Sequence, residues 1–157
     1  MANHSDSIEF FPAEVLERTA AKHPHKVALI AKEEQLSFAA LNERVRALAG
    51  HLRKEGVRQG DRAGLLLPNS IAIPLSYYAT QKIGAVTVIL DARLRGKELQ
   101  AVLRDADLRL LVVHSQLVAE VTDAFKELEA IPLWIVNGEG ERSFESRFVA
   151  ADTPLAL

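Results

Sequence analysis

The sequence predicts an α/β fold, namely a mainly parallel, doubly wound sheet with helices on both faces and a short antiparallel hairpin near the N-terminus. From residue 62 onward, apolar strand patterns alternate with single amphipathic helix patterns, which is typical of βαβ units. The run Val86–Leu90 consists of five consecutive apolar or β-branched residues. Continuous apolar character of this kind predicts a parallel strand that helices bury on both faces.

The N-terminal region is predicted to contain a tail, a helix and a loop. Residues 1–8 are interpreted as a flexible tail, and residues 9–157 as a single α/β unit. Pro12 suits the first turn of a helix, where its missing N–H costs nothing. His23 and His25 flank a proline in a polar stretch, which indicates a solvated loop, so we expect no metal site there.

A hairpin and a long helix follow. The segments 27–30 and 35–38 have the composition of short strands, and they are predicted to pair with each other. Ser37 is placed to cap a helix whose apolar residues then repeat at helical spacing, with Arg and Glu on the opposite side. Gly56 is expected to end this helix in a left-handed conformation.

Three further strands and four helices complete the predicted order. The segment 62–67 is a second apolar strand, and Asn69 or Ser70 is expected to cap the next helix. Pro74 predicts that this helix either begins late or kinks. The remaining elements are a helix from 98 to 105, a strand from 108 to 113, a helix capped by Ser115 that carries Phe125 and Leu128, a strand from 131 to 136 and a short helix from 143 to 149.

Composition excludes several classes of protein. The absence of cysteine rules out disulfide bonds, thiolate nucleophiles and cysteine-ligated metals. The formal net charge of −2 does not indicate the clustered cations that nucleic-acid binding needs. The longest apolar run, Ile83–Leu90, is far shorter than the ~20 residues that span a bilayer, and the polar start is unlike a signal peptide. We therefore expect a soluble, cytoplasmic protein with no nucleic-acid partner and no membrane span.

The candidate functional residues follow the predicted strand at Val86–Leu90. Arg93, Arg95 and Lys97 begin where this strand reaches its carboxyl end, and open parallel sheets bind ligands at that edge. Their side chains have the chemistry to hold a phosphate. A solvated cationic loop is the alternative, and the residues alone favour it, because isolated charges at loop starts are common on protein surfaces.

No catalytic motif is recognisable in the sequence. The pair Gly96-Lys97 lacks the earlier glycine of a Walker loop, because Asp91 occupies that position. Neither G-x-G-x-x-G nor G-x-S-x-G occurs. We therefore assign no catalytic residue and no metal-binding residue.

Five short motifs follow one another along the chain: LSFAAL at 36–41, GVRQGDR at 56–62, LPNS at 67–70, KIGAV at 82–86 and DARL at 91–94. In this order and at these spacings they resemble the start of the AMP-forming adenylating enzymes. That family includes acyl- and aryl-CoA synthetases, luciferases and the adenylation domains of peptide synthetases. The resemblance runs from about Pro12 to the end of the sequence.

The resemblance implies that the chain is the N-terminal portion of the large domain of an ATP-dependent carboxylic acid–CoA ligase, and that it ends before the phosphate-binding loop. Such an enzyme makes an acyl-adenylate from a carboxylic acid and Mg-ATP and then transfers the acyl group to coenzyme A. The 157 residues alone would hold no cofactor and would be inactive. Their partner would be the remainder of the synthetase, and the apolar surface left exposed by its absence would permit self-association.

Two departures from the family pattern concern particular residues. Ala40 stands where the family usually has Glu, which removes one half of a capping box at Ser37. The usual pattern P-x-N-P-R-L appears as ILDARL at 89–94, without either proline and with Asp91 in place of Asn. Arg93 matches the arginine that, in similar aryl-CoA ligases, approaches the 3′-phosphate of coenzyme A, whereas Arg95 and Lys97 are implicated only by proximity.

Two other functions stay open at this point. The first is a stand-alone, non-catalytic binding or interaction module built on the same sheet. The second is the front part of an adenylation domain that loads a carrier protein. Reading the codons that follow Leu157 would separate truncation from the stand-alone module, because only the truncated enzyme continues into a phosphate-binding loop.

Overall fold

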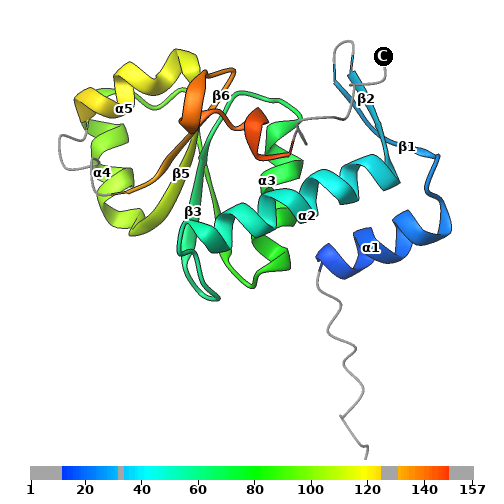
Figure 1. Ribbon diagram of the computed structural model, residues 1–157. Helices are drawn as coiled ribbons and strands as arrows, with labels where there is room; N and C mark the ends of the chain where they lie inside the picture. Colours follow the sequence, from blue (N-terminus) through cyan, green and yellow to red (C-terminus); the bar gives the residue numbers. More distant parts are fainter. Residues whose placement is uncertain (1–11, 32–33, 125–130, 149–157) are drawn as a thin grey trace, which may run out of the picture.

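The computed structural model describes residues 12–31, 34–124 and 131–148, so the predicted tail at 1–8 lies outside the described residues. The fold is α/β, as predicted (Figure 1). A parallel four-stranded sheet has helices on both faces, and a separate antiparallel hairpin of two strands lies near the N-terminal helix.

The parallel sheet has the strand order β4-β3-β5-β6. Its strands are β3 (Arg62–Leu66), β4 (Val86–Leu90), β5 (Leu108–His114) and β6 (Leu133–Val136). The chain passes outward from β3 to the edge strand β4, returns past β3 to β5, and then moves outward on the other side to β6. The neighbouring strands β3 and β5 are therefore followed by connections that run in opposite directions, which makes the position between them a topological switch point.

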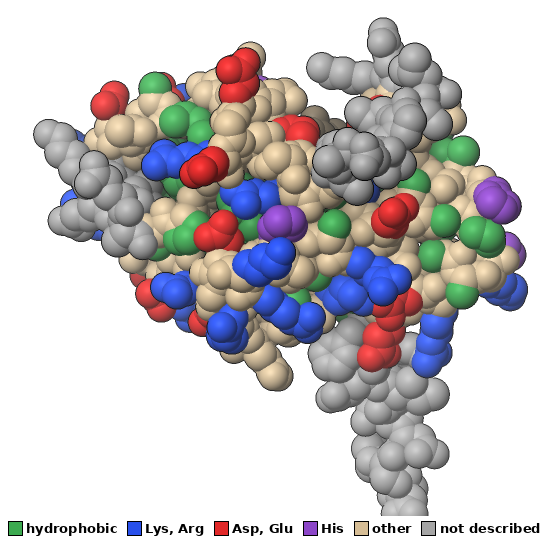
Figure 2. Space-filling model, viewed as in Figure 1, with side chains coloured by type: hydrophobic (Ala, Val, Ile, Leu, Met, Phe, Trp, Pro, Cys, Tyr) green, Lys and Arg blue, Asp and Glu red, His purple; other side chains and the backbone are tan. Residues whose placement is uncertain are grey.

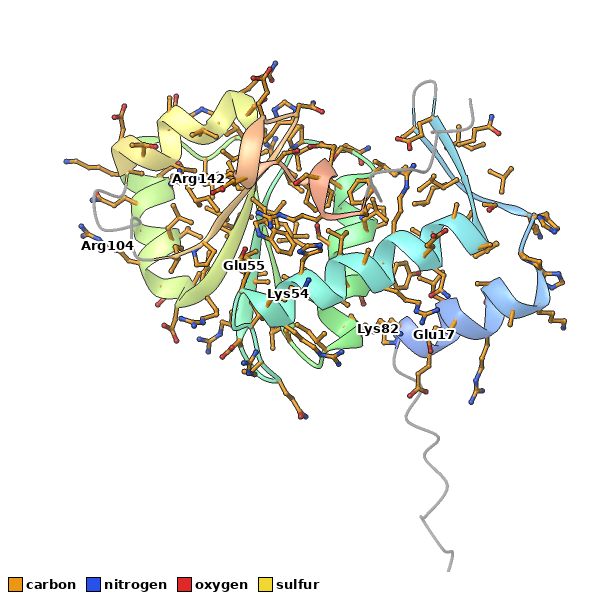
Figure 3. All side chains as sticks on the ribbon, viewed as in Figure 1. Glu17, Lys54, Glu55, Lys82, Arg104 and Arg142 are labelled. Carbon is orange, nitrogen blue, oxygen red and sulfur yellow. The ribbon has the colours of Figure 1, made fainter. Side chains whose placement is uncertain are left out.

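Helices from two groups cover the two faces of this sheet (Figure 1). One group consists of α2 (Phe38–Lys54) and α3 (Ala72–Lys82), against which α1 (Pro12–Lys22) packs, and the other consists of α4 (Gly96–Ala106) and α5 (Val118–Ala124). Successive residues of a strand point to opposite faces, so Leu65 belongs to the apolar core under the first group and Leu66 to the core under the second. An ion pair between Glu17 and Lys82 joins α1 to α3 (Figure 3).

The predicted hairpin and both predicted ends of the long helix that follows it are confirmed. β1 (Val27–Ala31) pairs with β2 (Glu34–Ser37) in an antiparallel hairpin. The Ser37 side chain caps α2, because its hydroxyl oxygen accepts a hydrogen bond from the Ala40 backbone N–H at 3.2 Å. Gly56 follows the helix end with a φ of +84°, the left-handed conformation that glycine adopts without steric cost.

The prediction that Val86–Leu90 is buried on both faces is wrong. Among the described strands, β4 lies at one edge of the sheet. Val86 and Ile89 are 47% and 63% exposed, whereas Leu90 is buried. The apolar, β-branched pattern correctly indicates a strand, because it reflects how well side chains fit a pleated surface. It does not report whether a further strand or helix covers that surface.

The predicted cap of the helix after β3 is also wrong. α3 has Ile71 at its N-cap position with no side-chain hydrogen bond, instead of Asn69 or Ser70. The late start of the helix is confirmed, and Pro74 is its third residue. Proline is tolerated there because the first four N–H groups of a helix have no partner within the helix.

The last helices differ from the predictions in a similar way. His114, not Ser115, caps the turn after β5, since its Nδ1 accepts a hydrogen bond from the Gln116 backbone N–H at 3.2 Å. A 3-10 turn, Ser115–Leu117, then precedes α5. Phe125 and Leu128 lie outside the described residues.

The described residues of the helix predicted over 143–149 do not form a regular helix, and residue 149 lies outside the described residues. Two 3-10 turns, Gly140–Arg142 and Glu145–Arg147, follow β6 instead. Phe144 between them is buried, and its ring lies 6.4 Å from that of Trp134, so this segment closes one end of the core. None of the helices in the part of the chain that the structure describes has the length and apolar character needed to cross a membrane.

Candidate functional site

All four parallel strands end at the same edge of the sheet. Leu66 of β3 is paired with Leu90 of β4 and with Val113 of β5, while His114 is paired with Val136 of β6. The segments that leave these strands therefore meet along one edge, and open parallel sheets bind their ligands there. This carboxyl edge is the candidate functional site.

The loop that leaves β4 carries a bidentate ion pair between Arg93 and Asp91. Nε of Arg93 lies 3.0 Å from Oδ1 of Asp91, and Nη2 lies 2.7 Å from Oδ2. The backbone N–H of Arg93 also donates to Oδ1 at 2.9 Å, and the backbone N–H of Leu94 donates to the Asp91 carbonyl oxygen at 3.0 Å. Asp91 therefore binds both the backbone and the side chain of this turn.

This ion pair changes the acidity of both partners. The guanidinium and the backbone N–H of Arg93 donate hydrogen bonds to the carboxylate and lower the pKa of Asp91 to about 2. The same interaction raises the pKa of Arg93 above its usual value. Both groups are charged at neutral pH, so the net charge of the pair is close to zero.

We expect the carboxyl group of Asp91 to titrate with a pKa of about 2, and we expect this pKa to return toward its ordinary value of 3.8 in Arg93→Ala. Because the folded pKa lies below the ordinary value, the contribution of this pair to stability is present above pH 3.8 and is lost as the pH falls through about 2. Carboxyl ¹³C chemical shifts measured against pH would test this. Arg104→Ala, which removes an exposed positive charge at the far end of α4, is the matched control and should leave the titration of Asp91 unchanged. An unchanged Asp91 midpoint in Arg93→Ala would contradict the pairing.

The other two predicted cations are arranged differently. Nη1 of Arg95 donates to the carbonyl oxygens of Ala92 and Leu94, both at 2.7 Å, and its Nε lies 3.8 Å from Oε1 of Glu120 on α5. Lys97 is exposed in the first turn of α4 and forms no ion pair with any residue that the structure describes. Arg95 therefore stabilises the loop, while Arg93 and Lys97 extend toward solvent.

Sequence reasoning missed the polar residues near the switch point between β3 and β5. His114 ends β5, and its Nε2 lies 3.1 Å from Nδ2 of Asn137, which follows β6. Ser70 follows β3, and its hydroxyl oxygen is buried without a hydrogen-bond partner among the described residues. His114 and Asn137 come together because β5 and β6 are neighbours, which no local pattern in the sequence reveals.

The described residues contain no group of three or more His, Asp and Glu that could hold a metal ion. Figure 2 shows cationic and anionic side chains interspersed over the visible face of the described residues. The segment 91–97, which carries Arg93, Arg95 and Lys97 and follows β4 at the carboxyl edge, is called the cationic loop below.

The model of one protein family, described as AMP-binding enzyme, matches residues 16–153. The match covers most of the chain, and the parallel sheet lies within it. The chain therefore belongs to the AMP-binding enzyme family.

Relatives of two kinds resemble this chain. A medium/long-chain-fatty-acid and 3-oxocholest-4-en-26-oate CoA ligase from Mycobacterium marinum is 30% identical over 128 residues, which are 82% of this chain and 23% of the ligase. Tyrocidine synthase 2 from Brevibacillus parabrevis is 31% identical over 109 residues, which are 69% of this chain and 3% of the synthase.

The fold is similar to that of a solved CoA ligase. The crystal structure of a long-chain-fatty-acid–CoA ligase from Archaeoglobus fulgidus matches with a TM-score of 0.75 and 26% identity, over 88% of this chain and 30% of that one. The chain thus spans between about a quarter and a third of the length of the two ligases.

Proposed function

We propose that this chain is the N-terminal portion of the large domain of an ATP-dependent carboxylic acid–CoA ligase. In this proposal residues 9–157 belong to an enzyme that first forms an acyl-adenylate and then an acyl-CoA thioester. The observation that carries the proposal is the family match over residues 16–153, together with a CoA ligase that is 30% identical over 82% of the chain. ATP, Mg and coenzyme A are the cofactors and cosubstrates of the complete enzyme.

The contribution of this chain to the reaction is a contact with coenzyme A. Arg93 would bind the 3′-phosphate, because its guanidinium is permanently charged and its planar geometry suits a phosphate. Its side chain is 91% exposed at the carboxyl edge of the sheet, so a large ligand has access to it. Lys97 adds a second positive charge at the start of α4, and Arg95 holds the loop between them.

The chemistry of adenylation would depend on residues outside this chain. The described residues offer neither a metal-binding cluster nor a recognisable nucleophile or phosphate loop. The ligases to which the chain is similar are about three to four times longer. We therefore propose that these 157 residues are inactive without the rest of the enzyme, which is their principal partner.

A second candidate function is the loading of a carrier protein. The similarity to tyrocidine synthase 2 favours it, because that relative is as similar in sequence to this chain as the Mycobacterium marinum ligase is, although over a shorter stretch. Both candidates share acyl-adenylate formation and differ in the thiol that accepts the acyl group.

Product analysis separates the two candidates. The longer protein that contains this chain would be incubated with ATP, Mg²⁺, a panel of carboxylic acids and either coenzyme A or a phosphopantetheinylated carrier protein. Formation of AMP and an acyl-CoA thioester supports the CoA ligase. Acylation of the carrier protein alone supports the second candidate, and absence of AMP formation with every acid would contradict both.

A further inference from the structure

We propose that Asp91 is a positioning residue for Arg93, which it holds in the orientation that receives the 3′-phosphate of coenzyme A. The inference rests on the proposed function, because it concerns the same phosphate contact. It goes further by assigning a role to an acidic residue that by charge alone would oppose phosphate binding.

The hydrogen bonds between these two residues leave one edge of the guanidinium available. Asp91 accepts from Nε and Nη2, which form one of the edges that a guanidinium can present to an anion. The edge formed by Nη1 and Nη2 has no acceptor among the described residues, and the side chain of Arg93 is 91% exposed. A phosphate can therefore bind in a bidentate manner without displacing Asp91.

The same aspartate also shapes the turn. Where the family pattern usually has two prolines, this sequence has Ile89 before the turn and Ala92 within it, so no proline ring fixes φ. Asp91 restricts the backbone by another route, since its carboxylate accepts from the Arg93 N–H and its carbonyl oxygen accepts from the Leu94 N–H. Aspartate is favoured in turns for this reason.

The net effect of Asp91 depends on two opposing contributions. Its negative charge repels a phosphate, but water and salt screen this repulsion because the pair lies at the surface. Against that, arginine loses much rotamer entropy when a ligand immobilises it, and the contacts with Asp91 order its side chain before the ligand arrives. The geometry therefore favours assistance over competition.

The test uses Asp91→Ala in the longer protein that contains this chain, with coenzyme A and 3′-dephospho-coenzyme A as alternative acceptors. We expect the KM for coenzyme A to rise about 3- to 10-fold, the scale of immobilising one side chain, and the KM for the dephospho form to stay the same. Asp91→Asn keeps an acceptor for the Arg93 N–H, so the rise should be smaller. In an Arg93→Ala background, Asp91→Ala should have no further effect.

An unchanged KM for coenzyme A in Asp91→Ala would overturn the positioning role. A lower KM for coenzyme A would overturn it too, because it would show that Asp91 competes with the phosphate. Equal rises in the KM for coenzyme A and for the dephospho form would also overturn it, because they would show general disorder of the loop. ATP–pyrophosphate exchange contains no coenzyme A and reports whether each variant is folded. If Asp91→Ala has lost exchange, Asp91→Asn decides by the same comparison of acceptors. If the unmodified protein forms no thioester, the proposed function is overturned as well. If it forms the thioester and the Asp91 variants have the same KM for coenzyme A as the unmodified protein, only this inference is overturned.

Discussion

Leu65→Ala is expected to lower the free energy of unfolding by about 2–5 kcal/mol, and Ile89→Ala by at most about 1 kcal/mol. The two residues are paired in register on neighbouring strands, so their side chains lie on the same face of the sheet. Leu65 is 1% exposed and its truncation leaves a cavity, whereas Ile89 is 63% exposed and leaves none. Urea denaturation of the 157-residue chain and the two variants measures the difference.

This comparison tests the position of β4 in the sheet as well as the size of a cavity effect. If Leu65→Ala and Ile89→Ala lower the free energy of unfolding by similar amounts, the edge position of β4 is contradicted, because Ile89 must then be buried in solution. Such a result would restore the sequence-based prediction of a strand covered on both faces, or would show that a second copy of the chain covers it. Measuring the losses at two protein concentrations separates these two explanations, since only the second depends on concentration.

Arg93→Ala in the longer protein is expected to raise the KM for coenzyme A about 5- to 30-fold, which corresponds to about 1–2 kcal/mol for one exposed charge-assisted contact. The adenylation half-reaction contains no coenzyme A, so the effect should fall on the thioester-forming step. Steady-state kinetics with varied coenzyme A measures it.

Arg104→Ala is the matched control for the loss of one positive charge. Arg104 is exposed in the last turn of α4, at the opposite end of that helix from the cationic loop (Figure 3). Its replacement should leave the KM for coenzyme A within about twofold of the unmodified value, because exposed charges farther apart than a Debye length interact weakly. Equal effects of Arg93→Ala and Arg104→Ala would mean that overall charge, not a specific contact, attracts coenzyme A.

Much of the fold could be predicted because its signals are local. The alternation of strand and helix patterns predicts the parallel sheet with helices on both faces. Ser37 and Gly56 mark the two ends of α2 through their own side chain and backbone, and the structure confirms both. These predictions need only neighbouring residues.

The predictions that failed depend on distant parts of the chain. Whether Ile89 is buried is decided by the strand order, in which β4 has a neighbour on one side only among the described strands. His114 caps the turn after β5 in place of Ser115, and it meets Asn137 because β5 and β6 are neighbours. No pattern within a short window reports either arrangement.

The candidate site could be predicted only where it depends on neighbouring residues. The position of Arg93 after a parallel strand is a local feature, and its place at the carboxyl edge of the sheet is confirmed by the strand register. Its pairing with Asp91 was not predicted, although the two residues are close in sequence, because the bond depends on the conformation of the turn. Its binding of coenzyme A stays a prediction.

The most direct test of the proposed function is carboxylate-dependent ATP–pyrophosphate exchange, measured for the 157-residue chain and for the longer protein that contains it. We expect clear exchange by the longer protein with at least one carboxylic acid and none by the chain alone, because the described residues contain no metal-binding cluster and no phosphate loop is recognisable in the sequence. Exchange by the purified 157-residue chain would contradict the proposal that its chemistry lies elsewhere, and absence of exchange by the longer protein with every acid would contradict the proposed ligase.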